Sequence, residues 1–378
     1  MKRFALVLSV LLVAFGFALA GCTETTKKET KTAELAVVTD VGQLMDGGFN
    51  QGTYEGVKAY AEANNKTYAY YQPENGANAT DADRVAAMEL AIENGAKVIV
   101  APGFLQQAAM ETVAKAHTDV KFVFVDGWNF GLSNVTAIAY KEQESGFLAG
   151  YAAVMEGYTK LGGVFGGAGS NPACNRFCYG YLQGANAAAL AKGITVEAKI
   201  SFNYGGSFSA SPELQAMAAG WYATGTQVIF SCGGSMVNSV ISAAGEYADA
   251  KIIGVDTDQS GLSSKVLTSA VKGLAASVQV VLGQYYAGEW DAKLANKTSN
   301  LGAAEDATGL PTAEGSWRFQ TFTKEQYNTL FASIKNGTVT PLSETPADCS
   351  VEGAWTLINA ALTNVNLEHV TATTATTE

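Results

Sequence analysis

The stretch Lys121-Phe-Val-Phe-Val-Asp-Gly-Trp128 decides the fold, because an uninterrupted apolar run ends there in a carboxylate and a glycine. A strand with one solvated face alternates apolar and polar residues, whereas a continuous run is typical of a strand buried on both faces. Similar runs occur at Leu35–Thr39 and Gln227–Ser231, each followed by an amphipathic segment. We therefore expect strands and helices to alternate around parallel sheets with right-handed crossovers.

The same pattern continues through most of the chain. The expected strands are Leu35–Thr39, Thr67–Gln72, Lys97–Ala101, Lys121–Val125, Val135–Ala139, Leu161–Phe165, Val196–Ile200, Gln227–Ser231, Lys251–Val255 and Val266–Val271. The expected helices cover residues 52–64, 82–94, 105–116, 142–157, 175–192, 211–224, 236–248 and 276–288. One set of strands ends near Ala139 and a second begins near Leu161, so we expect two similar three-layer α/β/α lobes.

The two lobes exchange segments in this prediction. The first lobe is expected to cover residues 35–139 and to be completed by about 258–290. The second is expected to cover residues 140–257 and to be completed by about 310–365, with a disordered tail at 370–378. About 340 residues between the chain ends suit two domains of ordinary size better than one core.

The N-terminus has the pattern of an export signal. Lys2 and Arg3 precede an apolar segment, and Leu19-Ala-Gly-Cys22 follows it. This order matches a secretory signal peptide, and a cysteine directly after Leu-Ala-Gly resembles a bacterial lipoprotein signal. The apolar segment is shorter than the ~20 residues that span a bilayer. We expect cleavage after residues 1–21, acylation of Cys22, and a flexible tether over residues 22–34 on the outer face of the cytoplasmic membrane.

Composition limits the chemistry that the protein can carry out. The formal net charge is −11 and becomes −13 without residues 1–21, and the body has no cluster of Lys and Arg, which argues against nucleic-acid binding. Besides Cys22, the cysteines are Cys174, Cys178, Cys232 and Cys349. The first two have a spacing that permits a bridge in an exported protein, but no histidine or second close cysteine pair completes a metal site. We expect no metal and no cofactor.

Polar and aromatic residues follow the expected strands, where parallel sheets bind their ligands. The candidate ligand-binding residues are Asp40, Phe49, Asn50, Asp126, Phe208, Gly234, Asp256 and Lys272. Carboxylates, an amide, two phenylalanines and bare glycine backbone suit a neutral, flat, hydroxylated ligand, whereas a phosphate site needs more Lys or Arg. A purely structural alternative exists for each residue: Asn50 fits a helix N-cap, Phe49 a core position and Lys272 the surface.

Seven short motifs occur in a characteristic order. They are T-D-x-G at 39–42, D-G-G-F-N at 46–50, F-V-D at 124–126, K-E-Q-E-S-G-F-L-A-G at 141–150, Y-G-G-S-F at 204–208, G-V-D-x-D-Q at 254–259 and T-S-x-x-K at 268–272. Together with the lipoprotein signal they resemble the basic membrane protein family, lipoproteins similar to the purine-nucleoside receptors of ABC importers. The resemblance implies a type I periplasmic-binding-protein fold, in which two lobes joined by a three-strand hinge close around a nucleoside.

The resemblance also implies a role for each candidate residue. Phe49 and Phe208 would stack on the base, and Asp126 with Asn50 would hydrogen-bond its edge. The ribose would be held by Asp40, Asp256, Lys272 and the backbone at Gly234. Glu144 is expected to support the hinge instead of touching ligand.

The expected function is therefore a monomeric binding protein that captures nucleosides, with purines favoured, and delivers them to a membrane permease. A sugar or another small metabolite is the alternative ligand within the same fold. An enzyme such as a nucleoside hydrolase or an esterase is disfavoured, because no G-x-S-x-G elbow occurs and His117 and His369 are the only histidines. A hydrolase could still use Asp40 and Asp46 with a metal.

Overall fold

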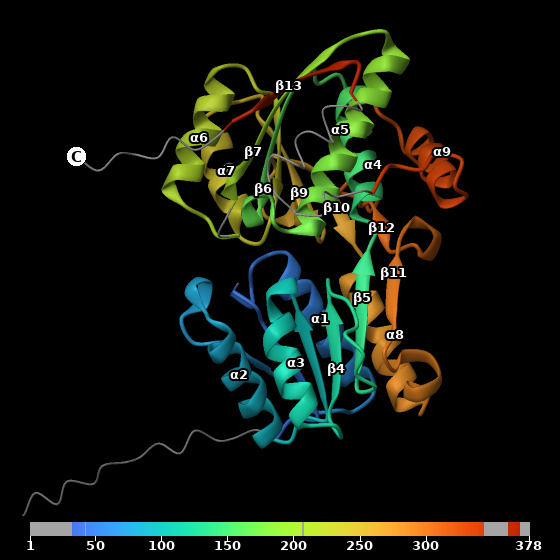
Figure 1. The fold of residues 1–378 in the computed structure, drawn as a ribbon. Coiled ribbons are helices and arrows are strands. Elements are labelled where there is room, and N and C mark those ends of the chain that lie inside the picture. Colours follow the sequence, from blue (N-terminus) through green and yellow to red (C-terminus); the bar gives the residue numbers. More distant parts are fainter. Residues whose placement is uncertain (1–31, 42, 206–207, 344–361, 371–378) are drawn as a thin grey trace, which may run out of the picture. The chain divides into compact units, whose positions relative to one another are not determined.

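The computed structural model describes residues 32–41, 43–205, 208–343 and 362–370 (Figure 1). The predicted signal peptide, the acylated Cys22 and residues 22–31 of the predicted tether lie outside the described residues, as do Cys349 and residues 371–378 of the predicted tail. Among the described helices, none has both the length and the apolar character needed to cross a membrane.

The first sheet is parallel throughout, in the order β11-β5-β4-β3-β1-β2. Its strands are β1 (Leu35–Val38), β2 (Tyr68–Tyr71), β3 (Val98–Pro102), β4 (Lys121–Val125), β5 (Val135–Tyr140) and β11 (Thr298–Leu301). Helices α1 (Phe49–Ala63) and α8 (Leu274–Tyr286) pack on one face, and α2 (Asp81–Glu93) and α3 (Gln107–Ala116) on the other. Leu35 and Val37 of β1 face the first pair of helices while Ala36 and Val38 face the second, which is why this strand is apolar throughout.

The second sheet has the order β12-β10-β9-β8-β6-β7-β13, and only β12 runs antiparallel to its neighbour. Its strands are β6 (Lys160–Gly166), β7 (Val196–Gly205), β8 (Val228–Cys232), β9 (Lys251–Asp256), β10 (Val266–Lys272), β12 (Thr308–Gly309) and β13 (Val365–His369). Its helices are α4 (Glu142–Glu156) and α5 (Pro172–Lys192) on one face, α6 (Pro212–Ala223) and α7 (Met236–Ala244) on the other, and α9 (Lys324–Lys335) beside α4.

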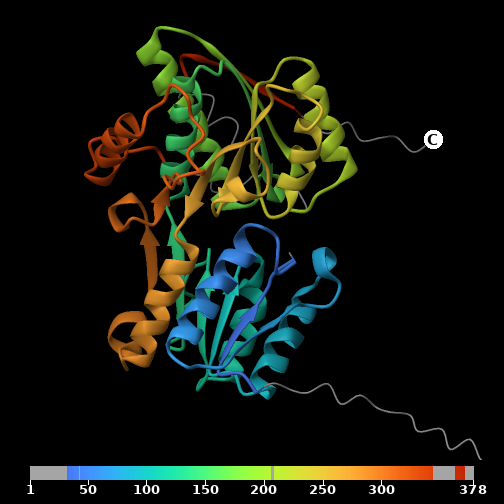
Figure 2. The ribbon, with the colours of Figure 1, turned by 180° about the vertical axis from the view of Figure 1, so that it is seen from behind.

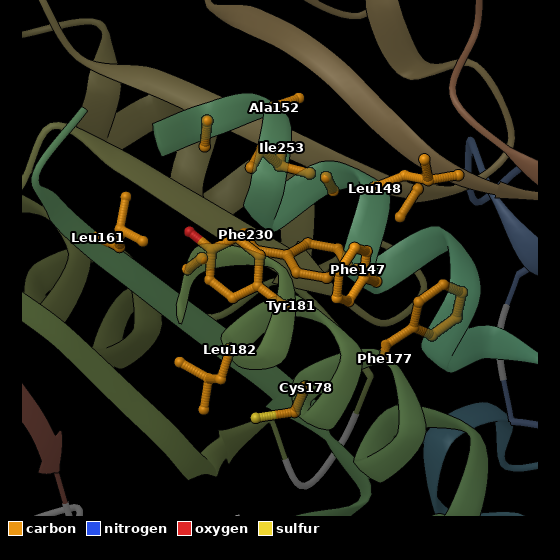
Figure 3. Close-up of a cluster of buried hydrophobic side chains, with 14 of the residues drawn as sticks. Phe147, Leu148, Ala152, Leu161, Phe177, Cys178, Tyr181, Leu182, Phe230 and Ile253 are labelled. Carbon is orange, nitrogen blue, oxygen red and sulfur yellow. The ribbon is translucent and has the colours of Figure 1, made fainter. Parts of the chain in front are cut away.

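Aromatic side chains fill the core between α4, α5 and the second sheet (Figure 3). The Phe230 ring lies 5.3 Å from the Tyr181 ring and 6.0 Å from the Phe177 ring, centroid to centroid. Glycines let α4 and α5 approach closely, since a Cβ at Gly150 would lie 1.9 Å from the Tyr181 carbonyl oxygen. This close approach holds the first turn of α4 beside the first turns of α5, both of which contribute to the site described below.

The chain passes between the two sheets three times. The first crossing joins β5 to α4, the second joins β10 to α8, and the third joins β11 to β12. As a result α8 and β11, late in the sequence, lie beside α1 and β5 (Figures 1 and 2). The Glu144 carboxylate accepts hydrogen bonds from Ala303 N (2.6 Å) and Thr308 Oγ1 (2.9 Å), and so contacts the third crossing.

All ten expected strands and all eight expected helices are present, with ends shifted by a few residues. The boundary at about residue 258 is wrong, because β10 pairs with β9 in the second sheet. Within residues 258–290 only α8 packs with the first sheet, which β11 then completes beyond residue 290. A single 3-10 turn, Gln259–Gly261, makes the β9–β10 crossover where a helix normally stands, so the sequence gives no signal that the chain stays in the second sheet.

The predicted tether and the predicted disordered tail each include residues that contact the folded body. Within the predicted tether, Ala33 N donates to Asn94 O and the Glu34 carboxylate pairs with Lys66 and Lys97. At the other end, Val370 N donates to Ile200 O next to β13. These contacts are made by backbone groups and polar side chains, which hydrophobic patterning does not detect.

Candidate functional site

A cavity of about 480 Å³ is lined by residues from the carboxyl ends of strands in both sheets. All eight sequence-predicted site residues line it: Asp40, Phe49, Asn50, Asp126, Phe208, Gly234, Asp256 and Lys272. The structure therefore brings together residues up to 232 positions apart in the sequence. Their roles as ligand contacts remain predictions.

The first turn of α1 is capped by Asp46. The Asp46 carboxylate accepts hydrogen bonds from the backbone N–H groups of Gly48 (2.9 Å), Asn50 (3.0 Å) and Gln51 (3.2 Å). The alternative that Asn50 is the N-cap is wrong, because Asn50 lies inside the helix and Gly48 precedes it. Capping by Asp46 leaves the Asn50 side chain available to the cavity.

The Asn50 amide is held in one orientation by two carboxylates. Its Nδ2 donates to Asp40 Oδ1 at 3.2 Å and to Asp46 Oδ2 at 3.3 Å. Its Oδ1 is buried and has no hydrogen-bond partner among the described residues. A buried acceptor without a partner costs about 1–3 kcal/mol, so a ligand that supplies a donor here would be favoured.

Lys272 is the centre of the charged part of the site. Its Nζ lies 2.5 Å from Asp126 Oδ2, 3.2 Å from Asp256 Oδ1 and 3.8 Å from Glu142 Oε1. Burial alone would lower the pKa of Lys272, but the three carboxylates outweigh it and hold this pKa well above its ordinary value. Lys272 is therefore a permanent cation here. Because its side chain is buried, the alternative that Lys272 lies on the surface is wrong.

The carboxylates around Lys272 have raised pKa values. Burial raises the pKa of Asp126 to about 6, although the charge of Lys272 opposes the shift. Burial likewise raises the pKa of Asp256, again against the effect of Lys272. The second oxygen of Asp126, Oδ1, is buried and has no hydrogen-bond partner in the described part of the chain. The site thus presents a second acceptor that a ligand donor can satisfy.

Glu142 and Arg176 complete this cluster and were missed by the sequence reasoning. Arg176 Nε lies 2.6 Å from Glu142 Oε2, and the Glu142 side chain is fully buried. Glu142 lies in the K-E-Q-E-S motif, and this motif could have indicated that Glu142 belongs to the site. Arg176 lies in none of the seven motifs. Arg176 and Lys272 are the two cations among the described lining residues, and both are ion-paired. An anionic ligand would therefore find no unpaired cation at this lining.

The two candidate aromatic rings belong to different halves of the site. Phe49 begins α1 and packs against the α1–α8 core, and Lys272 Nζ lies 4.8 Å from its ring centroid. Phe208 packs against the core of the second sheet. Its carbonyl oxygen accepts a hydrogen bond from Ser235 N, and a Cβ at Gly234 would lie 2.6 Å from that oxygen, so residue 234 has to be glycine.

Three of the candidate residues have a left-handed backbone. The φ angles are 59° at Asp126, 54° at Phe208 and 67° at Asp256. Residues other than glycine rarely adopt this conformation, and it is least expected for a bulky residue such as Phe208. Such strain costs on the order of 1–3 kcal/mol and is concentrated at functional sites.

The cysteines around the cavity are unpaired. Cys174 and Cys232 line it and Cys178 lies buried behind them, and all three are free thiols. The bridge between Cys174 and Cys178 is absent because both lie on α5, where side chains four residues apart have Cβ atoms about 5–6 Å apart, beyond disulfide range. Across the described residues, no group of three or more His, Cys, Asp and Glu side chains is arranged to hold a metal ion.

Asp46 gives a pH-dependent prediction. Burial raises the pKa of its carboxyl from 3.8 to about 6, although the three backbone N–H groups partly offset the burial. The folded chain therefore binds this proton more tightly than the unfolded chain, and the ionised carboxylate destabilises the fold as the pH rises from about 4 to about 6. Between pH 4 and pH 7 the free energy of unfolding of Asp46→Asn should rise relative to wild type by up to about 3 kcal/mol.

Urea unfolding of the ligand-free protein at both pH values measures this difference. Asp119→Asn is the matched control, because Asp119 is exposed. A stability difference between Asp46→Asn and wild type that stays constant with pH would contradict the prediction.

Comparison with known proteins places this geometry in a family. A family model described as "ABC transporter substrate-binding protein PnrA-like" matches residues 33–340. The chain belongs to this Bmp family. Bmp-family proteins are substrate-binding components of ABC transporters and are not enzymes, so the hydrolase and esterase alternatives do not apply.

Relatives of this Bmp-family chain include a nucleoside-binding protein, a basic membrane protein and a lipoprotein. It is 30% identical to "ABC transporter nucleoside-binding protein BmpA" of Lactococcus lactis subsp. cremoris, over 74% of this chain and 84% of that protein. It is 24% identical to "Basic membrane protein B" of Borreliella burgdorferi, over 80% and 89% of the two chains. It is 25% identical to an "Uncharacterized lipoprotein" of Pyrococcus abyssi, over 86% and 81%.

Solved structures confirm that the Bmp-family chain has the type I periplasmic-binding-protein fold. A solute-binding protein of an ABC transporter system from Aeropyrum pernix K1 superposes with a TM-score of 0.65 at 22% identity, covering 86% of this chain and 89% of that one. A transcriptional activator of the comK gene from Bacillus halodurans superposes with a TM-score of 0.64 at 17% identity, covering 82% and 99%. Since the fold serves both kinds of protein, the ligand has to be argued from the site.

Proposed function

We propose that the protein captures nucleosides, with purine nucleosides favoured, in the cavity between its two sheets and delivers them to a membrane permease. The observation that carries the proposal is one cavity lined by an aromatic ring from each half, Phe49 and Phe208, beside buried acceptors that lack a donor. Aromatic rings favour a flat heterocycle, and amine or hydroxyl groups of a nucleoside supply the missing donors.

The acceptors determine which ligand groups are useful. Asn50 Oδ1 and Asp126 Oδ1 each lack a partner among the described residues, so each would accept from a ring N–H, an exocyclic amine or a hydroxyl. Lys272 and Arg176 are already paired with carboxylates, which disfavours a phosphate group. A neutral nucleoside fits this arrangement. The Lactococcus lactis relative is named a nucleoside-binding protein, which supports the same choice of ligand.

Isothermal titration calorimetry tests the proposal. The protein is unfolded and refolded to remove bound ligand, then titrated with inosine, guanosine, adenosine and cytidine. We expect heat with the purine nucleosides and weaker or no heat with cytidine. Free ribose and hexoses test the sugar alternative in parallel. Absence of heat with every purine nucleoside would defeat the proposal, and binding of sugars alone would establish the alternative.

We further propose that the protein acts as an acylated monomer on the outer face of the cytoplasmic membrane. The sequence Leu19-Ala-Gly-Cys22 supports the anchor, and the Pyrococcus abyssi relative is named a lipoprotein. Both sheets of one chain supply lining residues of the cavity, so the proposed site needs no residue from a second copy. Detergent-phase partitioning tests the anchor: the wild type should enter the detergent phase and Cys22→Ser should not, and equal partitioning would contradict it.

A further inference from the structure

A contact outside the cavity joins the two halves of the molecule. The carbonyl oxygen of Gly47, in the turn before α1, accepts hydrogen bonds from Thr257 Oγ1 and Gln259 Nε2, each at 3.0 Å. Gly47 precedes a helix of the first sheet, whereas Thr257 and Gln259 follow β9 of the second. None of the three is among the lining residues of the cavity. This contact therefore spans the two halves without requiring a ligand.

Hydrogen bonds within the second half hold the Gln259 side chain in position for this contact. Its Oε1 accepts from Val255 N at 3.1 Å, its backbone N donates to Ser269 Oγ at 3.0 Å, and it is 1% exposed. These bonds lie within the second half and leave Nε2 directed at Gly47 O. A pre-oriented donor loses little side-chain entropy when it binds, so the bond across the halves is favoured.

Apolar contacts reinforce the same junction. A Cβ at Gly52 of α1 would lie 2.7 Å from Thr257 Cγ2, so the Thr257 methyl packs directly on the helix backbone. A Cβ at Gly47 would lie 3.2 Å from Leu262 Cδ1. The turn and the first helix of one half are thus seated on residues 257–262 of the other.

We propose that Thr257 and Gln259 are positioning residues that hold the two halves closed through the Gly47 carbonyl, and thereby slow ligand release without touching the ligand. Part of the closed state is then stabilised by the chain itself, and the ligand supplies the remainder. The effect on ligand release rests on the proposed function, because a nucleoside is the probe, but the effect on closure can be measured without ligand.

Two variants remove the donors and keep the packing. Gln259→Glu keeps the Oε1 acceptor for Val255 N and replaces the donating amide with a carboxylate oxygen facing Gly47 O. Thr257→Val keeps the methyl group against Gly52 and removes the hydroxyl. Matched controls are Gln279→Glu, whose amide donates to Ala275 O within α8, and Thr329→Val, whose hydroxyl donates to Glu325 O within α9.

The readouts separate positioning from folding. Each variant should raise the dissociation rate constant for inosine about 2- to 10-fold, the range expected for one hydrogen bond, and leave the association rate constant nearly unchanged. Small-angle X-ray scattering without ligand should show a larger radius of gyration than for wild type. The two controls should change neither quantity.

The outcomes are distinct. Unchanged dissociation rates together with unchanged ligand-free scattering in both variants would overturn the proposal, as would equal effects in variants and controls. If Gln259→Glu fails to fold, Thr257→Val alone decides. If the wild type binds no nucleoside, the proposed function fails, and the ligand-free scattering still decides whether Thr257 and Gln259 hold the halves together.

Discussion

Replacing Lys272 with methionine is expected to destabilise the fold by about 3–5 kcal/mol, the usual cost of removing one partner from a buried ion pair. The Lys272 side chain is 2% exposed and is the cation nearest to Asp126 and Asp256. Methionine fills similar space but leaves buried negative charge without compensation. Guanidinium chloride unfolding of the ligand-free protein at pH 7.5 measures the loss.

The loss should depend on pH in a direction that identifies its cause. Without Lys272 the main charge that opposes burial is lost, so the pKa values of Asp126 and Asp256 should rise further than they do in the wild type. The folded variant then binds protons more tightly than the unfolded chain, and its free energy of unfolding should recover as the pH falls from 7.5 to 5. Lys58→Met is the control, since Lys58 is exposed on α1. A loss below 1 kcal/mol at pH 7.5 would contradict the prediction.

Replacing Asp126 with alanine is expected to weaken nucleoside binding by about 2–4 kcal/mol, the cost of truncating a buried, charged hydrogen-bond partner. This corresponds to a roughly 30- to 700-fold higher Kd. The variant loses the acceptor Oδ1, which has no partner among the described residues, and it also releases Lys272 from its closest carboxylate. Calorimetric titration with the best-binding purine nucleoside measures the change.

Two further variants show whether the carboxylate itself is responsible. Asp126→Asn retains one acceptor oxygen and should weaken binding less than Asp126→Ala does. Asp119→Ala, at an exposed position in the same half, should leave the affinity unchanged. Wild-type affinity in Asp126→Ala would remove this residue from the ligand site, whatever happens to stability.

Residues directly after apolar strands were predictable because strand ends in parallel sheets share one edge. Asp40, Asp126, Asp256 and Lys272 follow or end such strands, and each lines the cavity. The charge pairing was not predictable in the same way. Asp126 and Lys272 were assigned to different parts of the ligand, yet they contact each other at 2.5 Å, because only the structure shows which loops face each other.

Residues supplied by helices were the main omission. Arg176 lies in the second turn of α5 and reaches the site because α5 packs closely on α4. Its partner Glu142 is the first residue of α4. This packing depends on glycines in the two helices, and a single sequence does not show which other helix packs against a given glycine. The strands β11 and β13 were missed for another reason: Thr298–Leu301 and Val365–His369 are largely polar edge strands, which lack a hydrophobic run.

The three crossings have a consequence for how the polypeptide matures. During synthesis or export from the N-terminus, β5 emerges about 160 residues before its neighbour β11. Until then the Val135–Tyr140 edge presents open backbone donors and acceptors, which invite pairing with other chains. A fragment that stops before Thr298 would keep that edge permanently open. The first half is therefore not an independent folding unit in sequence, and its last strand can be added only when the polypeptide up to Leu301 is available.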